Sequence, residues 1–210
     1  MSSKHQPRLT RLVWSICILI LPTTSLLAQE TISENVILVT LDGLRWQELF
    51  HGAERRLIDR EAGGVHDPEE TMRRFWHELV AQRRQKLMPF FWNVLAKQGQ
   101  VFGDPRRGSE ARVTNGLFFS YPGYNEILTG KADPKINSNA KRANSNVTVL
   151  EWLHGKPQYQ GRVAAFTSWD VFPFILNHQR SGIYVNAGWQ DLEHFRNRDE
   201  QDRLNKLARE

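Results

Sequence analysis

A continuous run of apolar and β-branched residues is the feature that most constrains the fold of this chain. Residues 36–41 read Val-Ile-Leu-Val-Thr-Leu, without the polar alternation of a half-exposed strand, and Asp42-Gly43 follows directly. Such a run is typical of a strand that is covered on both faces, as in a parallel sheet. The sequence therefore predicts a buried strand over residues 36–41, with Asp42 at its carboxyl end.

Helix and strand patterns alternate along the rest of the chain. Apolar spacing and turn residues predict helices at 44–50, 69–86, 89–98, 147–154 and 191–209, and strands beginning at 101 and covering 162–166 and 183–185. This alternation favours an α/β protein, in which a mainly parallel sheet is sandwiched by helices.

The first 28 residues have the profile of a secretory signal peptide. Three basic residues precede an apolar run at 12–21, which is too short to span a bilayer comfortably, and Ala28 offers a small residue for cleavage. We therefore expect a signal peptide at 1–28 and one domain at 29–210, located in the periplasm or secreted, with no membrane span after cleavage. Because Leu26 stands where a small residue is usual, a membrane-anchored structural protein with an uncleaved N-terminus remains an alternative.

Removing this segment changes the reading of the composition. The whole chain carries 28 basic and 23 acidic residues, but three of the basic residues lie in residues 1–28, so the mature chain has a net charge of only +2. A nucleic-acid ligand is therefore not expected. The one cysteine, Cys17, is removed too, and this excludes a disulfide, a thiolate metal site and a cysteine nucleophile from the mature protein.

A second segment, Ser120-Tyr-Pro-Gly-Tyr-Asn-Glu-Ile-Leu-Thr-Gly130, has the signals of a helix start and a helix end. The N-terminus of a helix favours negative charge, so Ser120 could be a nucleophile beside a bound phosphate. Asp42, at the end of a parallel strand, could ligate a divalent cation. Each residue also has a purely structural interpretation, because serine and aspartate both serve as helix N-caps.

Both segments resemble those of the alkaline phosphatase superfamily, particularly its secreted phosphodiesterase and nucleotide pyrophosphatase branches. Residues 36–45 are similar to the opening strand of that family, and residues 120–130 are similar to its nucleophile segment. Residues 87–104 resemble the helix and strand between these motifs. The resemblance runs from Val36 to Asn139 and implies an alkaline-phosphatase-like fold.

The resemblance also implies a reaction and the residues that perform it. Asp42 would ligate one of two divalent metal ions, for which zinc is the default of the family. Ser120 would be the metal-bound nucleophile, which takes the phosphoryl group from a phosphate mono- or diester and later yields it to water. Asn139, or alternatively Asn137, would donate a hydrogen bond to a phosphate oxygen. Gly123 stands where one branch of the family has an asparagine that contacts phosphate.

The set of metal ligands is incomplete. A two-metal site needs about six protein ligands, which the family supplies largely from Asp-His pairs. The only close Asp/His spacing after Ser120 is that of Asp191 and His194, in a segment that we interpret as the solvated face of a charged helix. We therefore expect residues 29–210 to be the N-terminal part of a catalytic domain that depends on a missing C-terminal half. Alone, it would bind metal only partially and have little activity.

A second interpretation comes from a different class of protein. A non-catalytic exported binding protein could keep the same fold and bind its ligand in a cleft lined by aromatic residues. The candidates are Trp169 and Trp189, each in a segment with other aromatic or glycine residues. Most such aromatic side chains belong to hydrophobic cores, so this interpretation depends on where the structure places them.

Overall fold

The computed structural model describes residues 35–193 and 197–209, so the expected signal peptide at 1–28 lies outside the described residues. The chain divides into two units, residues 1–40 and residues 41–210. Of the first unit, residues 35–40 are described. They lie in an extended segment without regular secondary structure.

The predicted strand at 36–41 is not a strand in this structure. Val36 is 87% exposed and Ile37 is 85% exposed, so the run is not covered on either face. Within the described residues the only sheet has two strands, and neither comes from this run. An apolar pattern reports that a segment gains from burial, but a strand also needs a hydrogen-bonded neighbour, which the pattern does not supply.

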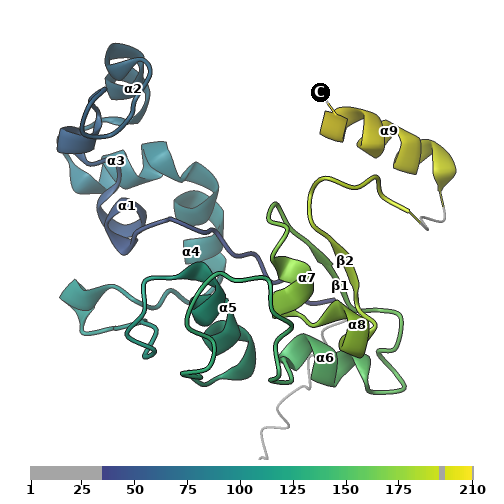
Figure 1. Cartoon of the computed structure of the whole chain (residues 1–210). Helices are drawn as coiled ribbons and strands as arrows, with labels where there is room; N and C mark the ends of the chain where they lie inside the picture. The colour runs from purple at the N-terminus through teal and green to yellow at the C-terminus, as the bar shows by residue number, and fades with distance from the viewer. Residues whose placement is uncertain (1–34, 194–196, 210) are drawn as a thin grey trace, which may run out of the picture. The chain divides into compact units, whose positions relative to one another are not determined.

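Helices dominate the second unit, which Figure 1 shows with their labels. The helices are α1 Trp46–His51, α2 Pro68–Phe75, α3 Val80–Leu87, α4 Ala96–Gln98, α5 Ser120–Thr129, α6 Val149–His154, α7 Phe172–Ile175, α8 His178–Ser181 and α9 Arg198–Arg209. Shorter turns are the 3-10 turns Arg55–Leu57 and Pro105–Arg107 and the π-helical turn Phe91–Leu95, which continues into α4.

The helix predicted at 69–86 is broken into α2 and α3. Asp67 starts α2, because its side chain accepts the N–H of Glu70 at 3.0 Å. The chain leaves the helix at Trp76, which has extended backbone angles. The imidazole Nδ1 of His77 then accepts the N–H of Leu79 at 2.9 Å, and α3 begins directly afterwards.

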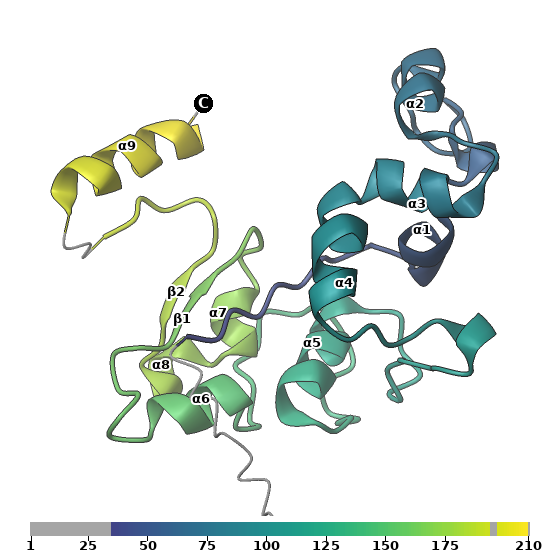
Figure 2. The same cartoon turned by 180° about the vertical axis from the view of Figure 1, so that it is seen from behind.

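Two of the predicted strands are present and pair in parallel. Strand β1, Ala164–Phe166, lies beside strand β2, Tyr184–Asn186, with Ala165 opposite Val185. Helices α7 and α8 form the crossover between the two strands, as Figures 1 and 2 show. The protein is therefore an α/β protein in a coarse sense, although its described sheet is small.

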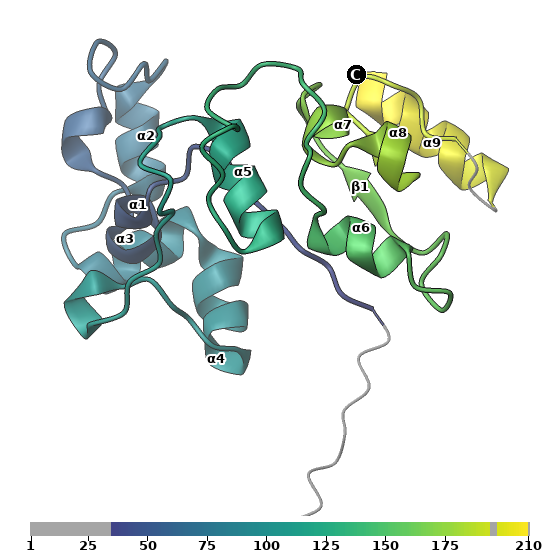
Figure 3. The same cartoon turned by 60° about the horizontal axis from the view of Figure 1, so that its bottom comes forward.

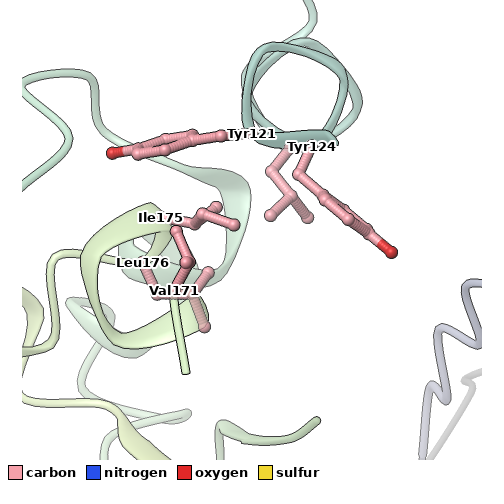
Figure 4. Packing of buried hydrophobic residues seen from close by; sticks show 6 residues of the cluster. Tyr121, Tyr124, Val171, Ile175 and Leu176 are labelled. Carbon is pink, nitrogen blue, oxygen red and sulfur yellow. The ribbon is translucent and has the colours of Figure 1, made fainter. Parts of the chain in front are cut away.

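The main hydrophobic core joins α5 to α7. Figure 4 shows its members from close by, with side chains of α5 on one side and those of the α7 segment on the other. The buried members are Tyr121, Tyr124, Leu128, Val171, Ile175 and Leu176. Tyr124 also packs edge-on against Phe172, with the ring centroids 4.7 Å apart. This core fixes α5, whose first residue is the predicted nucleophile.

The C-terminal helix α9 is anchored by polar contacts to the segment before it. Asn205 accepts the N–H of Leu192 at 2.6 Å and donates to its carbonyl at 3.1 Å, and Arg209 pairs with Asp191. Figure 3 shows α9 at the end of the chain. The predicted helix at 191–209 is thus shorter at its start, and His194 lies outside the described residues. No helix in the described part of the chain is long and apolar enough to cross a bilayer.

Candidate functional site

Helix α5 begins at Ser120 and ends where the sequence predicts. Phe119 has extended backbone angles, Ser120 is the first helical residue, and Gly130 closes the helix with a φ of 74° in the left-handed region. Glycine reaches that conformation without a steric penalty. Phe119 occupies the N-cap position and Ser120 is already helical, so the interpretation of Ser120 as an N-cap is wrong. Ser120 is partly exposed, and its hydroxyl makes no hydrogen bond with any described residue.

Asn139 lies at the same end of α5, although it is distant in the sequence. Its side-chain oxygen accepts the N–H of Tyr121 at 3.0 Å, one of the amide groups that a helix N-terminus leaves without an internal partner. Because the oxygen of the Asn139 amide faces this donor, its NH₂ group stays available to donate. Asn137 is exposed and makes no such contact within the described residues. Of the two asparagines that the sequence proposes, Asn139 is the one at the start of α5.

A buried amide network holds the loop that carries Asn139. Asn144 is fully buried and donates to the side-chain oxygen of Asn125 at 3.1 Å and to the carbonyl of Ile175 at 3.1 Å. Asn146 donates to the same oxygen of Asn125 at 3.2 Å and to Asp133 at 2.7 Å. This last hydrogen bond is the main cause of a lowered pKa at Asp133, so its carboxylate remains charged. The network ties α5 to α7 without any buried ion pair.

Glu126 fixes the segment that precedes Ser120. Its carboxylate accepts the backbone N–H groups of Thr114 at 2.6 Å and Asn115 at 3.1 Å, and also accepts from both side chains. Partial burial acts to raise the pKa of Glu126, but the hydrogen bonds from Thr114 and Asn115 outweigh it and leave the pKa lowered. The segment before Ser120 is therefore held in place by a charged carboxylate from the second turn of the same helix.

Tyr121, next to Ser120, has a structural role. Only 1% of its surface is exposed, and its hydroxyl lies 2.7 Å from the carbonyl of Arg142 and 3.2 Å from that of Phe174. Burial raises the pKa of Tyr121 to about 12. Because this side chain is buried and its hydroxyl is bonded to backbone carbonyl groups, Tyr121 anchors the start of α5.

Asp42 lies in an exposed turn before α1 and makes no hydrogen bond or ion pair with Ser120 or Asn139 within the described residues. Gly43 takes a φ of 74° there, which explains the need for glycine after the aspartate. Arg45 precedes α1 at the N-cap position, so the interpretation of Asp42 as the cap of that helix is wrong.

The described residues alone do not fit a two-metal centre. Across residues 35–193 and 197–209, no group of three or more His, Cys, Asp or Glu side chains is arranged to hold a metal ion. Asp42 and Ser120 would supply two of the roughly six ligands that two ions require. Asp191 is already paired with Arg209, which agrees with its interpretation as a residue of a charged surface.

The structure contains a groove that the sequence did not predict. Helices α5 and α6 line an open groove of about 570 Å³, with Ile127, Val147, Val149 and Trp152 among its walls. The tryptophans proposed for an aromatic cleft lie elsewhere: Trp189 is 81% exposed, while Trp169 packs against the core. The sequence signal for the groove is the spacing of three residues between Val149 and Trp152, which puts both side chains on one face of α6.

Sequence reasoning also missed a cluster of arginines around the end of α1. Arg83, Arg84 and Arg106 all contact α1 or the aromatic residues beside it. Arg83 and Arg106 donate to backbone carbonyl groups, which every residue has, and Arg84 packs on a tryptophan ring, so no motif in the sequence marks the cluster.

Comparison with known proteins yields no match: no family model, no curated protein and no solved structure is similar to this chain.

Proposed function

We propose that this chain supplies the nucleophile part of an exported, metal-dependent phosphoric ester hydrolase of the alkaline phosphatase type. The observation that carries the proposal is the position of Ser120 and Asn139. A free hydroxyl stands at the first residue of a ten-residue helix, and an amide from a distant loop is hydrogen-bonded to the next residue of that helix. The resemblance of residues 36–45 and 120–130 to that family supports the same assignment.

In the proposed reaction, the Ser120 hydroxyl oxygen attacks the phosphorus of a phosphate mono- or diester. The alcohol oxygen leaves and takes up a proton, while the serine proton passes to solvent. Water then hydrolyses the seryl phosphate, regenerates Ser120 and releases inorganic phosphate, or a monoester when the substrate is a diester. The NH₂ group of Asn139 donates to a non-bridging oxygen of the phosphate. The positive end of the α5 dipole stabilises the negative charge on that oxygen.

Divalent metal ions, zinc by the default of the family, would supply the charge neutralisation that phosphoryl transfer requires. Asp42 would be one of their ligands. Because the described residues do not fit a two-metal centre, we propose that the remaining ligands come from a C-terminal half of the catalytic domain. Alone, the chain would bind at most part of the metal set and react slowly. We propose the periplasm or the extracellular space as its location, on the basis of the signal-like residues 1–28.

The test is to identify the phosphorylated residue. The full chain is incubated with zinc and an aryl phosphate ester, and its peptides are analysed by mass spectrometry for a phosphoryl group. We expect phosphorylation at Ser120, its loss in Ser120→Ala, and a decrease of about tenfold or more in Asn139→Ala, because one oxyanion donor is removed. Ser145→Ala is the matched control, since Ser145 is exposed and should not affect the label. A label at another residue, an unchanged label in Ser120→Ala, or no label would contradict the proposal.

A second candidate function is that of a non-catalytic exported binding protein. The observation in its favour is the groove between α5 and α6, where Ile127 and Trp152 expose apolar surface. This function predicts that an apolar fluorescent dye binds the protein, that Trp152→Ala weakens the binding, and that Ser120→Ala and Asp42→Asn leave it unchanged. Dye fluorescence measured with these three variants separates the two functions, because hydrolysis depends on Ser120 and Asp42 and not on the groove.

A further inference from the structure

Three side chains converge on the last turn of α1, each donating to a different carbonyl group. Trp92 Nε1 donates to the carbonyl of Leu49 at 3.0 Å and Arg106 to that of Phe50 at 3.4 Å. Arg83 donates to the next carbonyl, that of His51, at 2.9 Å. A helix C-terminus carries partial negative charge and unpaired carbonyl groups, so cationic donors there stabilise it. Helix capping therefore explains Arg83 and Arg106.

Capping does not explain Arg84. Its guanidinium lies 3.7 Å from the centre of the Trp92 ring, but no carboxylate pairs with it within the described residues, and its Nε is buried without a hydrogen-bond partner. Buried N–H groups are nearly always paired, and a guanidinium N–H pairs most strongly with an anionic oxygen. Arg84 is only partly buried as a residue, so a small ligand can reach its remaining donors.

Positive charge exceeds negative charge around Arg84. Arg106 is paired with Asp104 at 3.1 Å, whereas Arg107 is exposed and has no ion-pair partner in the part of the chain that the structure describes. Burial, followed by repulsion from Arg106 and Arg107, lowers the pKa of Arg84, and Asp104 offsets this only in part. A bound anion would relieve the repulsion.

From this geometry we infer a second binding site, in which Arg84, Arg106 and Arg107 bind an oxyanion of the phosphate class. Arg84 donates from the terminal NH₂ groups of its guanidinium, which are not among the buried unpartnered atoms and form a planar pair of donors that matches two oxygens of such an anion. Trp92 holds the guanidinium in place by a cation–π contact. The site shares no residue with the start of α5 and does not depend on the proposed hydrolase activity.

The test is a titration of the full chain with inorganic phosphate, followed by the NMR signals of the arginine Nε–H groups and by calorimetry. We expect the Arg84 signal to shift when phosphate binds. Arg84→Gln and Arg107→Gln should each weaken phosphate binding about five- to tenfold, as the loss of one charge-assisted hydrogen bond implies. Arg84→Lys keeps the charge but loses the fork, so it should weaken binding less than Arg84→Gln does. Higher salt should weaken binding in the unmodified protein.

Arg74→Gln is the matched control. Arg74 also lies over an aromatic ring, that of Phe75 at 5.0 Å, but it has an acidic neighbour in Glu70, so its removal should change phosphate affinity by less than about twofold. Ser120→Ala separates the two phosphate sites and should leave the Arg84 shift intact. The inference is overturned if no binding is detected up to about 10 mM phosphate, a concentration well above the range of specific sites. It is also overturned if Arg84→Gln binds as well as the unmodified protein, or if Ser120→Ala abolishes the Arg84 shift.

Discussion

Two regions of the second unit secure their helix ends by different means. In residues 120–187, the neutral amides of Asn125 and Asn144 are fully buried and hydrogen-bonded beside an apolar core. In residues 46–107, Arg83, Lys86 and Arg106 reach across the surface and donate to backbone carbonyl groups. Both regions thus satisfy carbonyl groups with side chains. In the first, the buried donors are neutral amides, and Arg180 adds charged donors nearer the surface. In the second, most donors are cationic, and Trp92 is a neutral one.

The two regions also differ in how much apolar surface they bury. Six core residues are buried between α5 and α7, whereas the described residues from 46 to 107 contain only two buried hydrophobic side chains, Phe50 and Ala53. There two of the three tryptophan rings are covered by guanidinium groups: Trp76 by Arg83 at 4.5 Å and Trp92 by Arg84 at 3.7 Å. A packed, neutral region can hold a reactive hydroxyl in a fixed position. A region of charged contacts responds to salt and pH and keeps charge available for a ligand.

The largest effect is expected at Asn144, the centre of the neutral network. In Asn144→Leu, the carbonyl of Ile175 and the N–H of Asn146 lose their partner while they stay at least partly buried. Since an unpaired buried polar group costs about 1–3 kcal/mol, the free energy of unfolding should fall by about 4 kcal/mol. Denaturant unfolding followed by circular dichroism measures this change. The exposed Asn137→Leu should cost less than about 0.5 kcal/mol, and an equal loss in both variants would contradict a special role for the network.

Titration of Tyr121 should lower the stability of the folded protein at high pH. Its pKa is raised from 10 to about 12 in the folded protein, so the folded state keeps the neutral phenol where the unfolded state loses the proton. Stability is therefore complete below pH 10 and is lost as the pH rises from 10 to about 12, by about 2–3 kcal/mol. Unfolding measured between pH 9 and about 12 should show a smaller decline in Tyr121→Phe. The same decline in both proteins would refute the assignment.

A smaller effect is expected at Arg83 in the arginine-rich region. Arg83→Met keeps the aliphatic stem but removes the hydrogen bonds to the carbonyl groups of His51 and His77 and the contact with Trp76. We expect a loss of about 1.5 kcal/mol, because these donors face partly hydrated acceptors. Arg73→Met is the control. Arg73 is exposed and its side chain pairs only with Glu70, three residues earlier on the surface of α2, so its loss should cost less than about 0.5 kcal/mol. A loss at Arg83 as large as that at Asn144 would remove the contrast between the regions.

The smallest effect is expected from the titration of His51. Burial, with repulsion from Arg106 and Arg83, lowers the pKa of His51, and the nearby carboxylates of Asp104 and Glu54 oppose this shift without cancelling it. The folded state therefore takes up a proton less readily than the unfolded state. Stability is complete above pH 6.5 and falls as the pH drops from 6.5 through the folded pKa. Unfolding of His51→Phe should lack this step, and an unchanged pH profile would show that His51 does not cause it.

The sequence predicts those elements whose signals are local. The helix-start signal at Ser120 and the glycine at position 130 give α5 its correct bounds, and Thr148 starts α6 by accepting the N–H of Glu151 at 3.2 Å. The two short parallel strands also appear where their apolar runs predict. The break between α2 and α3 is absent from the prediction, because it depends on the His77 side chain and not on periodicity. The strand at 36–41 is wrong, because an apolar pattern cannot supply its hydrogen-bonding partner.

In the candidate site too, local signals are predictable from the sequence and contacts between distant residues are not. The order of the two segments and the family resemblance together predict that Ser120 and Asn139 belong to one site, and in the structure Asn139 accepts a hydrogen bond from Tyr121 at the start of α5. The contribution of Asn144 could not be read from an asparagine-rich stretch, because its bonds reach residues 19 and 31 positions away. The arginine cluster was missed for a similar reason, since most of its partners are backbone groups and tryptophan rings that are distant in the sequence.

Native-state hydrogen exchange tests the contrast between the two regions most directly. Amide protection is measured across the chain at increasing, sub-denaturing concentrations of guanidinium chloride. If the neutral core holds α5 and α7 together, their amides should exchange only through global unfolding, while those of α2 and α3 should exchange through local openings of much lower free energy. The contrary result would be equal protection of all four helices, with their amides exchanging through one common unfolding reaction. It would show that the charged contacts stabilise α2 and α3 as much as the core stabilises α5.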